Sequence, residues 1–177
     1  MMHYEHWEHC KKLIEEDKIA YARDYATEIA IKLGVSKELI DKIMSVNLKS
    51  YENRINNKMS TCISRAKTEN SVALCLYYDM DNGWESTMYI CKSYAHDNNY
   101  WITASRSWVD IGRARGFSGF YKNDAEAAFF CDNTSAGICL LLMLQTTVAF
   151  YNVAKAYRNC GLIICITATE NDFVRVA

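Results

Sequence analysis

The sequence predicts an α+β fold in which an N-terminal layer of about three helices packs on an antiparallel sheet of about five strands. Three observations support this fold class. Residues 3–66 carry apolar side chains at helical spacings of three and four, whereas residues 71–92 change to an apolar run, a turn and an alternating run. The segment Ala136–Leu144 is apolar nearly all round, which predicts a buried C-terminal helix before the last pair of strands.

Length and charge limit the organisation and the classes of function. The chain has 177 residues, enough for one ordinary core, and neither a repeat nor a linker composition divides it, so we expect a single domain over residues 1–177. The formal net charge of −1 excludes a global basic field of the kind that binds nucleic acid. Localised charged patches remain open.

The helices can be predicted in order from their apolar stripes and end signals. Residues 3–33 form one long helix or two joined helices, and Gly34 is placed to end them in a left-handed conformation. Ser36 is the expected N-cap of the next helix. Residues 51–66 form a third helix with one apolar and one polar face. Residues 110–122, rich in glycine, are expected to be a loop.

The hairpin at Ser71–Lys92 is the strongest β signal. Val72–Tyr78 is apolar on both faces and predicts an interior strand, Asp81-Asn82-Gly83 supplies the turn, and Trp84–Lys92 alternates.

Three later segments are expected to complete the sheet. Tyr100–Ser107 reads as a third strand, Leu162–Ile166 as a central strand, and Phe173–Val176 as a short last strand at an edge. Thr134 or Ser135 is expected to cap the long C-terminal helix, which would run to about Tyr157.

The chain carries signals of a cytoplasmic protein. Its first residues do not combine a basic segment with an apolar one, and Ala136–Leu144 is shorter than the roughly 20 residues of a membrane span. The cysteines lie inside apolar segments and never in a CxxC pair, which favours reduced core thiols over disulfides. We therefore expect a cytoplasmic location.

Candidate chemistry is sparse, and we predict no enzyme, no cofactor, no catalytic residue and no metal site. His3, His6 and His9 recur every third residue, so two of them could reach one zinc ion, but only His96 and scattered cysteines could complete the site. A cysteine–histidine pair with His96 would lack any local nucleophile signature.

A second weak pattern is the glycine-rich segment 112–119, which contains Arg113 and Arg115. Its glycine spacing is four and then three, so it matches neither phosphate-loop order. A flexible, partly basic loop is the better interpretation. A nucleic-acid contact through Arg106, Arg113 and Arg115 stays an alternative.

The aromatic content is more informative. Tyrosine and tryptophan gather in or beside the predicted strands, Trp108 among them, and on a sheet face that no helix covers they would form a protein-binding surface. If helices cover both faces, the same rings are ordinary core. With nearby acidic side chains, the predicted partner-binding residues are Tyr77, Asp79, Asp81, Trp84, Glu85, Tyr89, Trp101, Asp110, Glu170 and Asp172. Glu126 is a further acidic candidate.

In overall build, with a helical N-terminal half at Trp7–Ala66 ahead of a sheet that begins at Ser71–Lys92, the chain resembles the immunity proteins of contact-dependent growth-inhibition systems. These proteins share no universal motif, so the resemblance transfers no individual residue.

The resemblance implies a toxin inhibitor rather than an enzyme. Such a protein binds the C-terminal domain of a bacterial toxin, commonly a DNase or RNase, and neutralises it by protein–protein interaction in the cytoplasm. It implies no direct contact with nucleic acid or membrane and leaves the oligomeric state open. A small metal- or Cys/His-dependent enzyme and a nucleic-acid-binding regulator are the alternative functions.

Overall fold

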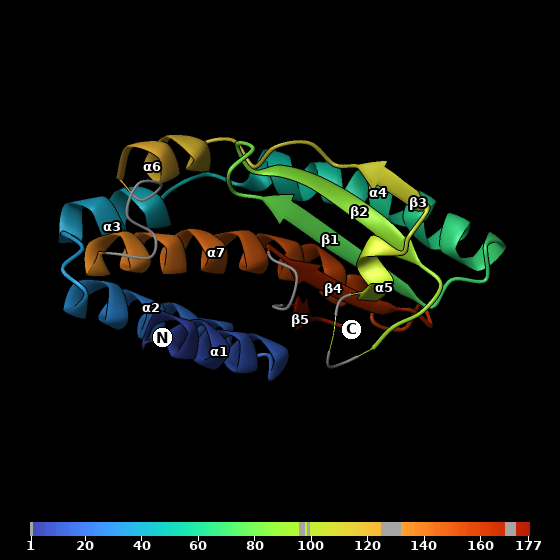
Figure 1. The fold of residues 1–177 in the computed structure, drawn as a ribbon, viewed down its shortest axis with the longest axis horizontal. Coiled ribbons are helices and arrows are strands. Elements are labelled where there is room, and N and C mark those ends of the chain that lie inside the picture. Colours follow the sequence, from blue (N-terminus) through green and yellow to red (C-terminus); the bar gives the residue numbers. More distant parts are fainter. Residues whose placement is uncertain (1, 96–97, 99, 125–131, 169–172) are drawn as a thin grey trace. The chain divides into compact units, whose positions relative to one another are not determined.

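The computed structural model describes residues 2–95, 98, 100–124, 132–168 and 173–177 (Figure 1). In chain order its elements are α1 (Met2–Glu15), α2 (Ile19–Lys32), α3 (Lys37–Met44), α4 (Lys49–Thr68), β1 (Ala73–Asp79), β2 (Glu85–Cys91), α5 (Tyr100–Thr103), β3 (Ser107–Asp110), α6 (Phe117–Asp124), α7 (Asn133–Ala154), the 3-10 turn η1 (Lys155–Tyr157), β4 (Ile163–Thr167) and β5 (Phe173–Arg175). The predicted α+β class is confirmed, with four helices rather than three before the first strand in the described residues.

The chain divides into two compact units. The first comprises Met1–Asn47 and Arg115–Val148, and the second comprises Leu48–Ala114 and Ala149–Ala177. Of the N-terminal helices, α4 belongs to the unit that contains the sheet, while α1, α2 and α3 belong to the other. The single domain expected over residues 1–177 stays a prediction.

In the first unit, the residues predicted to end one helix and to cap the next, Gly34 and Ser36, do so. The helical conformation is interrupted between α1 and α2 at Asp17, whose φ is +62°. The two helices lie side by side (Figure 1). Gly34 follows α2 with φ +91°, and the Ser36 hydroxyl accepts a hydrogen bond of 3.2 Å from the Leu39 amide. Both predictions are confirmed because each depends only on local backbone needs: a left-handed residue after a helix and an acceptor for its first free amides.

The helix α7 has a cap other than the one expected. The Asp132 carboxylate accepts hydrogen bonds from the Ser135 amide at 3.0 Å and from the Ser135 hydroxyl at 2.9 Å, so neither Thr134 nor Ser135 is the N-cap. These bonds favour the charged form and hold the pKa of Asp132 below its ordinary value. Within the described residues, Asn133–Tyr157 is long and apolar enough to cross a membrane by length and composition, but 89% of its most apolar window is buried, as in a core helix.

Gly137 permits close packing between α7 and the end of α2 in the first unit. A Cβ atom at this position would lie 2.7 Å from Val35 Cγ2 and 3.3 Å from Ala30 Cα. We expect Gly137→Ala to lower the free energy of unfolding by about 1–3 kcal/mol, the usual cost of overpacking, although alanine is the better helix former. Urea titration would measure the change.

Gly119 in α6 is the matched control for Gly137. A Cβ atom there would meet nothing within 4 Å, so Gly119→Ala is expected to stabilise the protein by up to about 1 kcal/mol. Equal stability of the Gly137→Ala variant and the parent would contradict the packing argument.

The second unit contains a mixed five-stranded sheet in the order β3-β2-β1-β4-β5. β1 pairs with β2 in antiparallel register and with β4 in parallel register, so the expectation of a wholly antiparallel sheet was wrong. A parallel neighbour needs a long crossover, and the chain between β1 and β4 supplies one. β1 and β4 are interior strands and β5 is an edge, as predicted.

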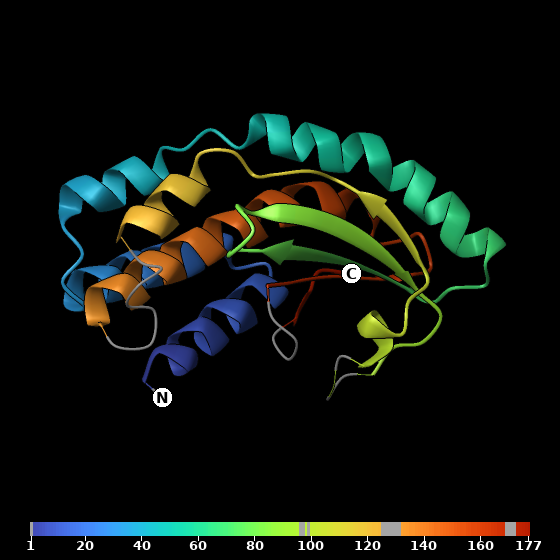
Figure 2. The same ribbon diagram turned by 45° about the horizontal axis from the view of Figure 1, so that its top comes forward.

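Different helices cover the two faces of this sheet, as Figure 2 shows. On one face lies α4, where the buried Tyr51 hydroxyl is 2.7 Å from Ser86 Oγ of β2. The other face carries α5, which packs Trp101 and Ile102 into a cluster with the strand residues Ala73, Cys75, Cys91, Cys165 and Phe173. Because successive strand residues alternate between faces, these contacts assign every strand side chain to the α4 face or the α5 face.

The third strand begins later than predicted. Tyr100–Thr103 is the short helix α5, with the Tyr100 amide 3.3 Å from Asn98 Oδ1 and the Trp101 indole donating to Asn98 O. A strand would send the adjacent Trp101 and Ile102 to opposite faces, whereas the helix buries both. The expected loop at residues 110–122 contains the end of β3 and the start of α6 instead.

Candidate functional site

An open area lies on the α5 face of the sheet, in the half nearest the hairpin turn. Cross-strand register brings together side chains from three neighbouring strands, because directly paired residues point to the same side. We call these seven residues the sheet-face patch: Tyr77 and Asp79 of β1, Glu85, Thr87 and Tyr89 of β2, and Trp108 and Asp110 of β3. All seven are partly or fully exposed.

Three aromatic rings form the centre of the patch. The Tyr77 and Tyr89 rings meet edge to face with centroids 6.5 Å apart and an interplanar angle of 72°. Tyr89 is paired directly with Trp108 on the next strand, and 51% of Trp108 is exposed. Tyrosine and tryptophan combine a large apolar area with a polar group, which makes such rings common anchors of protein interfaces.

Three carboxylates border the rings at the end of the patch nearest the hairpin turn. Asp79 and Glu85 are paired across β1 and β2, and Asp110 is paired with Thr87. The Asp79 carboxylate accepts a hydrogen bond from the Asn82 amide at 3.1 Å, which fixes the start of the turn.

Compensation of this negative charge is small. Glu85 forms a long ion pair with Arg113: the distance from Arg113 Nη2 to Glu85 Oε2 is 3.9 Å, and both side chains are about half exposed. An exposed pair at that distance contributes little. The patch therefore combines an aromatic centre with an acidic border.

Most of the predicted binding residues lie together. Tyr77, Asp79, Glu85, Tyr89 and Asp110 all belong to the sheet-face patch, and the exposed Asp81 lies in the adjoining turn. Glu126, Glu170 and Asp172 lie outside the described residues.

Two predicted tryptophans do not lie on the open surface. Trp84 is 0% exposed and stacks on Tyr78, with ring centroids 6.1 Å apart, on the α4 side of the sheet. Its φ of +63° ends the turn and sends the ring inward. Trp101 of α5 is 4% exposed, and its ring packs against the rings of Tyr94 and Phe173. Both predictions of a surface position were wrong, because the strand pattern was extended to Trp84, which lies in a turn, and to Trp101, which lies in a helix.

Trp108 was missed as a binding residue although its ring type was noted. The third strand was predicted to end at Ser107, so the pairing of Trp108 with Tyr89 could not be anticipated. The available signal was the alternation in Trp108-Val109-Asp110, whose first and last side chains point to the patch.

β3 is an edge strand that borders the patch, and a side chain of α4 forms hydrogen bonds with it. Arg65 of α4 donates to Trp108 O at 3.1 Å and to Ser107 Oγ at 2.8 Å. These bonds hold the edge strand against α4 and fix the backbone that carries the Trp108 ring.

The histidines pack against an aromatic ring in the described part of the chain. His6 Nδ1 lies 2.8 Å from the Tyr25 hydroxyl, and the His9 ring is 4.3 Å from the Tyr25 ring centre. No three histidine, cysteine or acidic side chains form a metal-binding group among the described residues. The side chain of His3 and all of His96 lie outside them.

The strand cysteines are buried thiols. Cys75, Cys91 and Cys165 share the covered half of the α5 face, and among the described cysteines only Cys160 is not buried. Burial raises the pKa of the Cys91 thiol to about 12, which keeps it protonated at neutral pH. The predicted burial of the strand cysteines is confirmed, and their thiols are poor nucleophiles.

Comparisons with protein-family models, with curated proteins and with solved structures found no match for this chain. The geometry of the sheet-face patch therefore carries the functional argument.

Proposed function

We propose that this protein is an immunity protein that binds a cognate bacterial toxin domain with its sheet-face patch and neutralises it. The observation that carries the proposal is the open sheet face itself, where Tyr77, Tyr89 and Trp108 are bordered by Asp79, Glu85 and Asp110. Interface centres are enriched in tyrosine and tryptophan, and complementary charge around them speeds and orients docking.

The charge of the patch favours a basic partner. Its three carboxylates face only the weakly paired Arg113 within the described residues, so a partner that presents lysine or arginine gains new ion pairs on docking. Surfaces that bind phosphate are basic for the same reason, and a nuclease domain has such a surface. A basic nuclease toxin therefore fits the patch better than a nucleic acid, which the carboxylates would repel.

The resemblance in build to immunity proteins of contact-dependent growth-inhibition systems supports the same partner. In this proposal the protein acts in the cytoplasm of the cell that makes the toxin, by stoichiometric binding and without catalysis. The regulator alternative depends on Arg106, Arg113 and Arg115, and one of these, Arg113, lies next to Glu85 of the acidic border.

The test is direct inhibition of the toxin domain encoded immediately upstream of this chain's gene. We expect the purified protein to bind that domain and to inhibit its nuclease activity at a one-to-one ratio. The double variant Glu85→Lys, Asp110→Lys should bind at least about a hundredfold more weakly, because like charges across an interface cost several kcal/mol. Titration calorimetry would give the affinities, and a nuclease assay would give the inhibition.

A double variant with the same change in net charge serves as the control. Asp24→Lys, Asp41→Lys alters two exposed carboxylates of α2 and α3 and should leave toxin affinity unchanged. Failure of the parent protein to bind the upstream toxin domain would end the proposal. Equal weakening by both double variants would remove the assignment to the patch.

A further inference from the structure

The edge strand β3 lacks the burial that usually holds a strand in place. None of its four side chains is fully buried: Ser107 and Val109 are half-buried, and Trp108 and Asp110 are exposed. Burial of apolar surface therefore contributes little to the position of this strand. Trp108 and Asp110 nevertheless belong to the sheet-face patch, so whatever holds β3 also sets the geometry of the patch.

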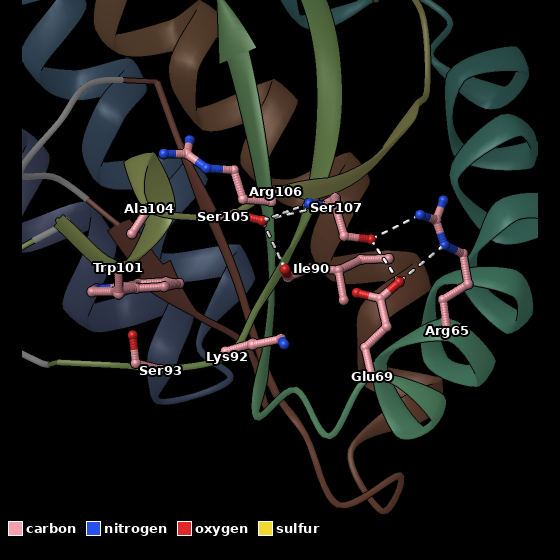
Figure 3. A pocket seen from close by; sticks show the side chains of 10 residues that line it. All are labelled: Arg65, Glu69, Ile90, Lys92, Ser93, Trp101, Ala104, Ser105, Arg106 and Ser107. Carbon is pink, nitrogen blue, oxygen red and sulfur yellow. Dashed lines mark hydrogen bonds and ion pairs between the residues drawn. The ribbon is translucent and has the colours of Figure 1, made fainter.

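At its start, β3 is held by a group of polar side chains from α4. Arg65 donates from Nη2 to Ser107 Oγ at 2.8 Å and from Nη1 to Trp108 O at 3.1 Å. The Ser107 hydroxyl donates to Glu69 Oε1 at 2.9 Å, and Arg65 Nε lies 3.6 Å from the same oxygen. Figure 3 shows the Arg65 guanidinium, the Glu69 carboxylate and the Ser107 hydroxyl meeting between α4 and β3. A planar guanidinium that donates to two acceptors fixes direction as well as distance.

A second arginine of α4 holds the backbone at the other end of the strand. Arg54 donates from Nε to Ile111 O at 3.1 Å and from Nη2 to Arg113 O. Arg54 is half-buried, and its Nη1 donates to Ser50 Oγ of the same helix, which orients the guanidinium. The residues directly after β3 are thereby tied to α4.

The two arginines lie on one stripe of α4. Arg54 and Arg65 are eleven residues apart, about three turns at 3.6 residues per turn, so both side chains leave the helix in nearly the same direction. Their acceptors belong to β3 and to the residues that follow it, whereas the Trp108 ring points to the α5 face of the sheet. The arginines therefore act on the patch through the backbone of β3.

We propose that Arg54 and Arg65 are positioning residues that hold the Trp108–Asp110 part of the sheet-face patch in the arrangement that the partner binds. The inference rests on the proposed function for the identity of that partner. Without the arginines, β3 detaches for part of the time, and the apparent affinity falls in proportion to the fraction of molecules with β3 in place.

Hydrogen–deuterium exchange of the free protein tests whether the arginines hold the strand. The segment 107–114 contains amides that donate to the carbonyls of Trp84 and Ser86. Arg65→Lys keeps the charge but cannot reproduce the two-acceptor geometry, so we expect exchange in this segment to be about tenfold faster or more, the usual loss of a charged hydrogen bond. Arg54→Gln should have the same effect at the C-terminal end of the segment.

Surface plasmon resonance with the upstream toxin domain tests the consequence for binding. We expect Arg65→Lys to associate about fivefold more slowly or more, with little change in dissociation, because β3 must be in place before docking and the complex then holds it there. A residue that contacts the partner directly changes mainly the dissociation rate instead. Loss of charge cannot explain the result, since lysine keeps the charge.

Lys58→Gln is the matched control, because Lys58 is an exposed cation of α4 that lies between the two arginines in the chain. It should exchange and bind like the parent. The proposal is overturned if Arg65→Lys exchanges in the segment 107–114 like the parent, if exchange speeds up equally throughout the chain, or if it speeds up in this segment while toxin association stays the same. Failure of the parent to bind the toxin domain would end the proposed function alone, and the exchange result would still decide whether the arginines hold β3.

Discussion

Replacement of Trp84 by alanine is expected to lower the free energy of unfolding by about 3–5 kcal/mol, the usual cost of removing a large aromatic side chain from a core. The Trp84 ring is fully buried and stacks on Tyr78 with an interplanar angle of 26°. Alanine cannot fill that volume, and the surrounding strands can relax only in part.

The backbone of Trp84 separates this packing effect from a turn effect. Its amide donates to Asp79 O at 2.8 Å and its carbonyl accepts from the Ala114 amide at 3.2 Å, and both bonds are available to alanine. Its positive φ is uncommon for a bulky residue, and alanine bears a similar backbone cost there. The expected loss therefore measures burial of the ring.

Guanidinium chloride unfolding followed by circular dichroism would measure the change. The matched control is Trp108→Ala, which removes the same side chain from a half-exposed position and should change stability by no more than about 0.5 kcal/mol. A loss of less than about 1 kcal/mol for Trp84→Ala would contradict the buried position of this ring.

The second large effect concerns binding. If the sheet-face patch binds the toxin domain, Trp108→Ala should weaken the complex by about thirtyfold or more, since a tryptophan at an interface centre contributes about 2 kcal/mol or more. Trp108 is the most exposed ring of the patch and its backbone is tied to Arg65 of α4, so it is presented in a fixed position. Titration calorimetry with the upstream toxin domain would measure the loss.

Tyr100 provides the control for this second prediction. It is 77% exposed, belongs to the same unit and lies outside the patch. Tyr100→Ala should leave both toxin affinity and stability close to those of the parent. Unchanged affinity of the Trp108→Ala variant would place the interface elsewhere, even if the protein proves to inhibit the toxin.

The two tryptophan variants together separate the fold from the site. Trp84→Ala should lose stability, and Trp108→Ala should keep stability and lose the partner. No single substitution makes that distinction, because a destabilised variant also binds poorly when part of it is unfolded.

Local signals determined a large part of this fold. The alternation in β2, the uniformly apolar β1 and β4, the left-handed Gly34 and the Ser36 cap all follow from backbone and burial requirements within a few residues. The acidic and aromatic residues at Tyr77, Asp79, Glu85 and Tyr89 could be proposed for a surface because they recur at every second position of a predicted hairpin.

Only the tertiary structure decided which aromatic rings are exposed. Trp84, Trp101 and Trp108 are the same residue type in neighbouring segments, yet the first two are buried and the third is half exposed. Alternation says that a strand has two faces, but it cannot say which face a distant helix covers. That outcome depended on α4, on the α5 helix in place of a predicted strand, and on the parallel pairing of β1 with β4. The packing of α4 on the sheet and the pairing of β1 with β4 are set by contacts between residues far apart in the chain, which a local sequence pattern does not reveal.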